Sequence, residues 1–330
     1  MVKLNRKKHL VTKVRKEKQA NVMKKIITLT LNPALDKSIS VHQLVPEKKL
    51  KCTDAKVEPG GGGINVSRAI HKLGGSSEAV YLSGGYTGKQ FEELMVAENI
   101  VSVVLPMKGA TRENFVVLDA SANLQYRFGM EGPEVNEPEW QQALDHIKEQ
   151  NDVAYIIASG SLPPCVPTDF FGRLAVIAKQ KKARLIVDTS GEALQHAVKE
   201  GLFLIKPNLG ELSNLYGKEK LAKEEILNAA RSIISGGGCE VMVVSMGAAG
   251  AMLITLDKQF EVKPPDVTIH STVGAGDSMV GGMVLALSKD WDLEAVLRYG
   301  VAAGTAATLN RGTELCKKED TERLFAEMKR

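Results

Sequence analysis

The sequence has few of the features that mark secreted, membrane or metal-binding proteins. Its four cysteines lie far apart and form no CxxC pair, which argues against a disulfide framework and a zinc site and favours a reducing compartment, the cytoplasm. No apolar run approaches the roughly 18 residues of a membrane span. None of the six histidines is paired at metal-ligand spacing. What remains is a chain of ordinary globular composition, with enough hydrophobic residues to bury a large core.

The net charge of +4 is a property of the first 22 residues. Residues 1–22 contain eight Lys or Arg and one acidic residue, so the remainder has 35 basic and 38 acidic residues and a net charge of −3. The basic segment lacks aromatics for stacking on nucleic acid and an apolar stripe for a membrane surface. We therefore expect residues 1–22 to be a disordered extension, residues 23–330 to form the folded domain, and neither nucleic acid nor membrane to be a partner.

Strand-length apolar runs alternate with helix-period segments along the folded part of the chain. This alternation predicts an α/β fold, with a mainly parallel sheet covered by helices on both faces. The predicted strands are 26–31, 78–82, 154–158, 184–187, 202–205, 241–244, 251–254, 260–262 and 267–270, and the predicted helices are 65–73, 91–99, 167–181, 221–235, 278–287 and 293–309.

Two regions in the N-terminal half interrupt this alternation. Residues 38–58 and 101–128 read as short strands with polar alternation and no helix between them. We expect them to form a small separate sheet that acts as a lid on the main domain. Because a small sheet with one apolar face needs covering, the sequence also predicts a homodimer through the lid.

A glycine-rich turn before a helix is the strongest chemical signal in the sequence. Gly274, Ala275 and Gly276 precede Asp277, and a helix pattern of small residues follows. The free amides of a helix N-terminus can stabilise charge on a transferring phosphoryl group. Asp277 can accept the proton of an attacking hydroxyl. The turn alone is a weak pattern, because glycine-rich turns often precede helices.

A run of four glycines at residues 60–63 precedes a second predicted helix. Such a run costs backbone entropy, and close approach of the backbone to a ligand explains it better than packing does. Gly61 and Gly62 are therefore candidate substrate contacts. The dinucleotide fingerprint GxGxxG is not met, because Asn65 stands where its last glycine would fall. An Asn here suits a polyol, since its amide both donates and accepts hydrogen bonds.

Asn208 and Glu211 follow a predicted strand in the segment KPNLGE. Their spacing places an amide and a carboxylate oxygen on one face of a helical turn, which suits Mg²⁺ held through water. The same spacing is that of a helix cap with Glu at its third position. The two interpretations remain open at this point.

Three further segments are each ambiguous by themselves. The small residues 245–250, and 300–312 with Asn310, could admit a purine, although packing explains each segment better when it is taken alone. Ser161 follows a strand but lacks the GxSxG pattern of a nucleophile, so it is a candidate sugar or phosphate contact. Residues 84–90 resemble a phosphate-binding P-loop, but the spacing of their glycines does not match that motif, and Gln90 replaces its Ser or Thr.

Taken together and in order, these segments resemble the PfkB (ribokinase-like) family of sugar kinases, from about Met23 to the C-terminus. The resemblance implies the ribokinase-like fold: a mainly parallel sheet between two helical layers, with a β-lid that carries the dimer contact. It rests on LNPALD at 31–36, the GGGGIN run at 60–65, 159–164, KPNxxE at 206–211 and TVGAGDS at 272–278.

The resemblance implies a role for each matching residue. Asp277 matches the catalytic base and Gly274 to Gly276 the anion hole. Mg²⁺, as MgATP, is the implied cofactor, while the need for a monovalent cation stays open. Asp36 and Asn65 would bind sugar hydroxyls, and Ser161 would also contact the substrate. Arg112 would bind the sugar phosphate, as would Lys49 on the lid, which could serve the neighbouring subunit. Asn208 and Glu211 would bind Mg²⁺, and the nucleotide would be bound by Lys206, Ser245, Gly247, Gly250, Thr272 and Asn310.

Within the family, the GGGGIN run and the segments 187–194 and 306–313 resemble the ATP-dependent 6-phosphofructokinase branch. Asn32-Pro33 and residues 132–134 are instead similar to the 1-phosphofructokinase and tagatose-6-phosphate kinase branches, which usually carry GGKG in place of the glycine run. Because Gly62 replaces that lysine, we expect transfer of the ATP γ-phosphoryl to the 1-hydroxyl of fructose 6-phosphate, a glycolytic step. The other two branches are the alternatives, and an inert fold that binds nucleic acid or regulates through the basic segment is a remote one.

Overall fold

A large, mainly parallel sheet forms the centre of the chain. The computed structural model describes residues 24–310 and 312–328, so the predicted extension 1–22 lies outside the described residues. Over these residues nine strands pair in the order β13-β12-β11-β10-β9-β8-β1-β4-β5, and β12 is antiparallel to both of its neighbours. The strands are β1 (Lys25–Thr30), β4 (Glu78–Ser83), β5 (Val101–Pro106), β8 (Val153–Ser159), β9 (Arg184–Asp188), β10 (Leu202–Ile205), β11 (Cys239–Ser245), β12 (Ala251–Ile254) and β13 (Gln259–Val262).

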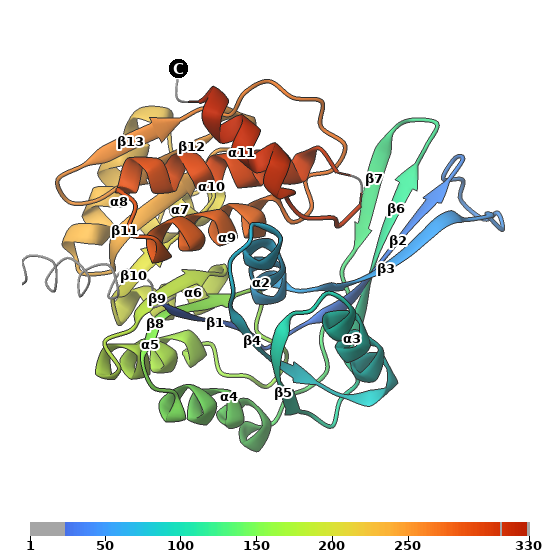
Figure 1. Cartoon of the computed structure of the whole chain (residues 1–330), viewed down its shortest axis with the longest axis horizontal. Coiled ribbons are helices and arrows are strands. Elements are labelled where there is room, and N and C mark those ends of the chain that lie inside the picture. Colours follow the sequence, from blue (N-terminus) through green and yellow to red (C-terminus); the bar gives the residue numbers. More distant parts are fainter. Residues whose placement is uncertain (1–23, 311, 329–330) are drawn as a thin grey trace, which may run out of the picture.

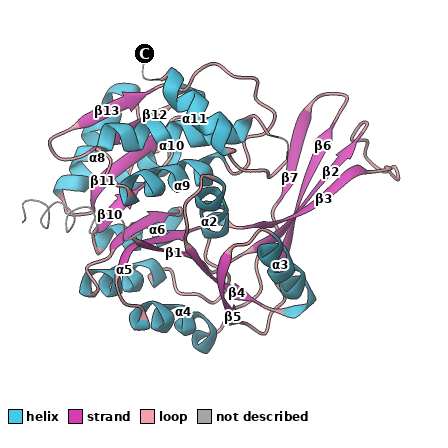
Figure 2. Cartoon of the chain, viewed as in Figure 1, coloured by secondary structure: helices cyan, strands magenta, loops and turns pink. Residues whose placement is uncertain are grey.

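Helices cover both faces of this sheet, as predicted (Figures 1 and 2). Alternate residues of β1 point to opposite faces: Ile27 belongs to one buried cluster with Trp140 and Phe170, and Ile26 to the other with Met279. The first face carries α4 (Glu137–Glu149), α5 (Phe170–Gln180), α6 (Gly191–Lys199), α7 (Leu209–Tyr216) and α8 (Ile226–Ser235), and the second carries α2 (Gly62–Lys72), α9 (Ala275–Ser288), α10 (Leu293–Thr308) and α11 (Lys318–Glu327).

A second sheet of four strands projects from one side of the main body (Figure 1). Its order is β3-β2-β6-β7, and β2 pairs in parallel with β6 and antiparallel with β3. The helix α3 (Gly85–Ala97) lies beside its base, where Leu35 and Phe91 share a third buried cluster. The strands are β2 (Ala34–Val41), β3 (Thr53–Gly60), β6 (Arg112–Asp119) and β7 (Leu124–Phe128).

Two predicted strand assignments are wrong. The lid range 101–128 includes β5, which pairs with β4 in the main sheet, because Val103 and Leu105 face the core on alternate positions. The predicted strand 267–270 does not form. Its segment runs past the end of α10, where the His270 amide donates to the Thr308 carbonyl instead of to a neighbouring strand.

The strand order fixes where a ligand can bind. The chain runs outward from β1 through β4 to β5 and then returns to β8 on the other side of β1. Loops at the carboxyl ends of β1 and β8 therefore diverge, and such a switch point is where open α/β sheets bind ligands. None of the described helices is both long and apolar enough to cross a membrane.

Candidate active site

A cavity of about 320 Å³ opens at the carboxyl ends of the central strands. Gly62, Ser161 and Asp277 line it together, although they are far apart in the sequence. Asp188 at the end of β9 and Glu211 in α7 add two further carboxylates. The switch point thus brings together residues from the glycine run, the β8 loop and the turn before α9.

Asp277 lies in the first turn of α9, which begins after Gly274 in the left-handed conformation (φ 72°). The side-chain amide of Asn65 donates to its Oδ2 atom at 2.9 Å. Burial, with a smaller contribution from the negative charge of Asp188, raises the pKa of Asp277 to about 7. A carboxyl group that titrates near neutral pH is well matched to the role of a general base.

Lys206 supplies positive charge beside the turn before α9. Its Nζ lies 3.3 Å from Asp188 Oδ1, and a Cβ on Gly276 would lie 3.5 Å from the same nitrogen. Burial lowers the pKa of this ammonium, but the carboxylates of Asp188, Asp277 and Glu211 outweigh burial and raise it. Lys206 therefore stays protonated, and with the α9 amides it can stabilise an anion.

The glycine run packs against protein atoms more closely than we expected. A Cβ on Gly62 would lie 2.3 Å from Ser159 Oγ, one on Gly63 would lie 2.6 Å from the Leu29 carbonyl, and one on Gly60 would lie 2.0 Å from Asp36. Close packing on β1, β2 and β8 therefore explains three of the four glycines, which corrects the sequence argument. Gly62 lines the cavity as well.

The small sheet contributes Asp36, near the start of β2, and Arg112, the first residue of the neighbouring strand β6. Asp36 is buried and accepts a hydrogen bond from Asn114 Nδ2 at 2.9 Å; burial raises its pKa. Arg112 donates to the carbonyls of Met130 and Asn32 at 2.7 and 3.0 Å, and its Nε has no partner among the described residues. Two backbone carbonyls therefore hold the guanidinium, and its remaining N–H donors can bind a ligand.

Ser161 and Lys49 differ in how the structure places them. Ser161 Oγ accepts from the Asn32 amide at 3.1 Å, so Asn32 links it to Arg112. Lys49 is exposed in the loop between β2 and β3, at the end of the small sheet that points away from the main body (Figure 1). Lys49 is thus not brought to the site within this chain.

A second cavity, of about 390 Å³, adjoins the same turn on its other side. Met279, Val267 and Val301 give it an apolar wall, which suits an aromatic base. Four of the predicted nucleotide residues line it, namely Ser245, Gly247, Gly250 and Thr272.

Asn310 and Lys206 are not among the lining residues of this second cavity. The buried Asn310 amide donates to the carbonyls of Ala306 and Leu315, at 3.3 and 3.0 Å. It therefore holds the chain beyond α10 rather than facing the cavity.

Asn208 and Glu211 form the helix cap that the sequence left as one of two interpretations. Asn208 Oδ1 accepts from the Glu211 amide at 2.9 Å, and Glu211 Oε2 accepts from the Asn208 amide at 2.8 Å. In the part of the chain that the structure describes, no group of three or more acidic, His or Cys side chains could hold a metal. Glu211 nevertheless lines the first cavity, so the pair fits a Mg²⁺ that arrives with phosphates and is held through water.

The sequence argument missed two charged residues at the site. Asp188 ends β9 beside Lys206, and its place at the carboxyl end of a parallel strand could have revealed it. Arg127 on β7 donates to Thr272 Oγ1 at 2.8 Å, which places a cation over the turn before α9. No sequence signal marks Arg127, because only the pairing of the small sheet brings β7 to the turn.

Comparison with known proteins agrees with this geometry. The family model for pfkB family carbohydrate kinases matches residues 29–320. The chain is 44% identical over 309 residues to ATP-dependent 6-phosphofructokinase isozyme 2 of Escherichia coli K12, which covers 93% of this chain and all of that protein. It is 31% identical over 304 residues to 1-phosphofructokinase of Bacillus subtilis, covering 92% and 98% of the two chains.

Three solved structures of phosphofructokinase-2 from Escherichia coli superpose closely on this chain. They have TM-scores of 0.89 to 0.90 and identities of 42 to 44%, and each covers 93% of this chain and 100% of its own. One is a complex with potassium, one a complex with fructose-6-phosphate, and one a tetrameric inhibited form. With the family model spanning most of the sequence, these matches show that the chain belongs to the pfkB family of carbohydrate kinases.

Proposed function

We propose that this protein is an ATP-dependent 6-phosphofructokinase, which transfers the γ-phosphoryl of MgATP to the 1-hydroxyl of fructose 6-phosphate. The observation that carries the proposal is the position of Asp277, a carboxyl with a pKa of about 7 at a turn that separates two cavities. The sugar would occupy the first cavity and the nucleotide the second. The transfer would then take place across the turn before α9.

Each residue at the turn has a task in this reaction. Asp277 takes the proton of the attacking hydroxyl, and Asn65 keeps the carboxylate oriented through its 2.9 Å hydrogen bond. The amides at the start of α9 and the ammonium of Lys206 stabilise charge on the transferring phosphoryl group. Asp36 binds a sugar hydroxyl, and Arg112 binds the sugar phosphate as a planar fork.

We propose Mg²⁺ that enters with ATP as the cofactor. Glu211 and Asn208 would hold it through water, and the ion would offset negative charge on the ATP phosphates. A monovalent cation is a further proposed cofactor, because a relative's structure contains potassium.

We also propose that the reaction takes place in the cytoplasm. All four cysteines are free thiols, two of them buried, which suits a reducing compartment.

The choice of fructose 6-phosphate rests on Gly62 and on the 44% identity to a 6-phosphofructokinase. The test is ADP release by the purified protein with MgATP and, in parallel, fructose 6-phosphate, fructose 1-phosphate and tagatose 6-phosphate. We expect the highest kcat/KM with fructose 6-phosphate. A preference for another sugar would keep the mechanism but reject this substrate, and no turnover with any of the three would reject the function.

Replacing the base should slow the chemical step. Asp277→Asn removes the proton acceptor but keeps the side-chain shape, so kcat should fall by ~10²–10⁴-fold. Asp290→Asn, at an exposed residue just beyond the far end of the same helix, is the matched control and should leave kcat unchanged. A near-normal kcat in Asp277→Asn, with the far-ultraviolet circular dichroism of the parent, would contradict the assigned role.

Replacing Arg112, the proposed ligand of the sugar phosphate, should raise KM for one substrate only. Arg112→Ala removes charged hydrogen bonds worth about 1.5–3 kcal/mol each, so KM for the phosphosugar should rise by at least about tenfold. KM for ATP should stay within about twofold of the parent value. The exposed Arg173, which pairs with Asp169 at the start of its own helix and lies over the Trp140 ring, gives the control Arg173→Ala. Equal increases in both KM values would show that Arg112 holds the small sheet rather than the phosphate.

We propose further that the protein forms a homodimer through the small sheet. Leu124, Tyr126 and Phe128 alternate along β7 and are 54, 39 and 48% exposed, so one apolar face of this edge strand is uncovered. A second copy on this face would cover it and could bring its Lys49 to the site.

Phe128→Glu should therefore convert the dimer to a monomer in analytical ultracentrifugation. Tyr86→Glu changes a residue that is 84% exposed in α3 and should leave the dimer intact. A parent protein that sediments as a monomer at micromolar concentration would contradict the dimer. A dimer that survives Phe128→Glu would contradict the small sheet as its interface.

A further inference from the structure

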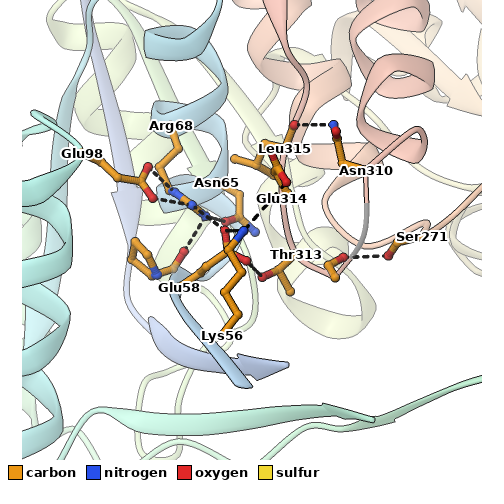
Figure 3. Close-up of polar contacts among 12 residues, drawn as sticks. Lys56, Glu58, Asn65, Arg68, Glu98, Ser271, Asn310, Thr313, Glu314 and Leu315 are labelled. Carbon is orange, nitrogen blue, oxygen red and sulfur yellow. Dashed lines mark hydrogen bonds and ion pairs between the residues drawn. The ribbon is translucent and has the colours of Figure 1, made fainter. Parts of the chain in front are cut away.

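A buried arginine joins the base of the small sheet to the helix that carries Asn65. Arg68 is 1% exposed, and its five N–H donors all find acceptors (Figure 3). It binds both oxygens of Glu98 at 2.7 and 2.5 Å, Glu58 at 3.3 Å, the Pro59 carbonyl at 2.8 Å and Asn65 Oδ1 at 3.5 Å. A planar fork held on every side cannot shift without breaking charged hydrogen bonds. Arg68 thus fixes β3 to α2.

Glu58 carries this network across to the C-terminal part of the chain. Its second oxygen, Oε2, accepts a hydrogen bond from Thr313 Oγ1 at 2.7 Å, between residues 255 positions apart. Burial raises the pKa of Glu58, but the Thr313 hydroxyl and the charges of Arg68 and Lys56 outweigh burial and lower it. The carboxylate is therefore ionised, and the neutral hydroxyl gives it a partner without adding charge.

The loop that contains Thr313 lies behind the turn before α9. The Gly312 carbonyl accepts from Ser271 Oγ at 2.7 Å, and Ser271 Oγ in turn accepts from the Val273 amide at 3.2 Å. A Cβ on Gly274 would lie 2.5 Å from Leu315 Cδ2, so this side chain backs the turn directly. The loop therefore supports the turn on both sides of Thr313.

We propose that Glu58 and Thr313 are positioning residues for phosphoryl transfer. Their hydrogen bond holds the turn that stabilises the phosphoryl group in register with β3 and α2, which carry the glycine run and Asn65, and with Asp36, which lies opposite Glu58 on β2. The two halves of the site belong to distant parts of the sequence, and phosphoryl transfer depends on their alignment. The catalytic part of this inference rests on the proposed function.

Thr313 allows a cleaner test than Arg68 or Glu58, because removing one partner of a buried ion pair can unfold the protein. Thr313→Val keeps the side-chain shape and removes only the hydroxyl. We expect kcat to fall roughly tenfold, which corresponds to about 1.4 kcal/mol of transition-state stabilisation, with KM for ATP within about twofold of the parent. Thr313→Ser restores the hydroxyl and should recover most of kcat.

Thr321→Val is the matched control. Thr321 is also fully buried, and its hydroxyl donates at 2.8 Å to the Lys317 carbonyl at the start of its own helix, not to the small sheet. This variant can lower Tm as Thr313→Val does, but it should leave kcat unchanged. The inference would be overturned if Thr313→Val kept kcat within twofold of the parent value or if Thr313→Ser failed to restore kcat. It would also be overturned if Thr321→Val lost as much activity as Thr313→Val.

Hydrogen–deuterium exchange tests the same contact without relying on any substrate. In Thr313→Val, amides 272–276 should exchange about tenfold faster than in the parent, and in Thr321→Val they should exchange at the parent rate. The exchange measurement separates the two proposals. If the parent showed no turnover, the 6-phosphofructokinase function would be rejected, while faster exchange of 272–276 in Thr313→Val would still support the positioning contact. Unchanged exchange of 272–276 in Thr313→Val would reject the contact's role.

Discussion

The site depends on one carboxyl group around which the protein has displaced much of the water. Asp277 is half-buried at the start of α9, and this loss of hydration by itself would favour the neutral form. The ammonium of Lys206 and the amide of Asn65 offset part of that cost, whereas Asp188 adds to it. The balance leaves a group whose proton is exchanged easily near neutral pH, which is the property that a general base needs.

The fold supplies each of these neighbours from a different element. Lys206 follows β10, Asp188 ends β9, and Asn65 projects from α2. Parallel strands deliver their carboxyl ends to one edge, so the sheet order itself gathers these charges. The small sheet then adds Asp36, Arg112 and Arg127 from above the same edge, and Arg127 reaches the turn through Thr272.

Much of the fold was predictable because its signals are local. Apart from β5 and the segment 267–270, the strands of the main sheet were predicted within one or two residues, since a buried strand is a short continuous apolar run. The glycine turn before α9 and the pair Asn208 and Glu211 were also found from local spacing. Whether that pair caps a helix, binds a metal or does both depends on what faces Glu211, and the sequence does not contain that information.

The errors arise where tertiary contacts decide. β5 reads like the small-sheet strands but joins the main sheet, because its neighbour β4 precedes it across α3. The glycine run looked like a ligand loop, whereas Ser159 and the Leu29 carbonyl demand glycine at Gly62 and Gly63. No sequence signal marks Arg68, since nothing local shows that Glu58 and Glu98 converge on it.

The most direct test of the account is the pH dependence of kcat at saturating MgATP and fructose 6-phosphate. The base acts only when ionised, and its pKa is about 7, so kcat should be half-maximal near pH 7 and fall toward tenfold per pH unit below it. The plateau should lie above pH 8. An acid limb near pH 4, the ordinary range of an exposed carboxyl, would contradict the claim that a desolvated Asp277 is the base.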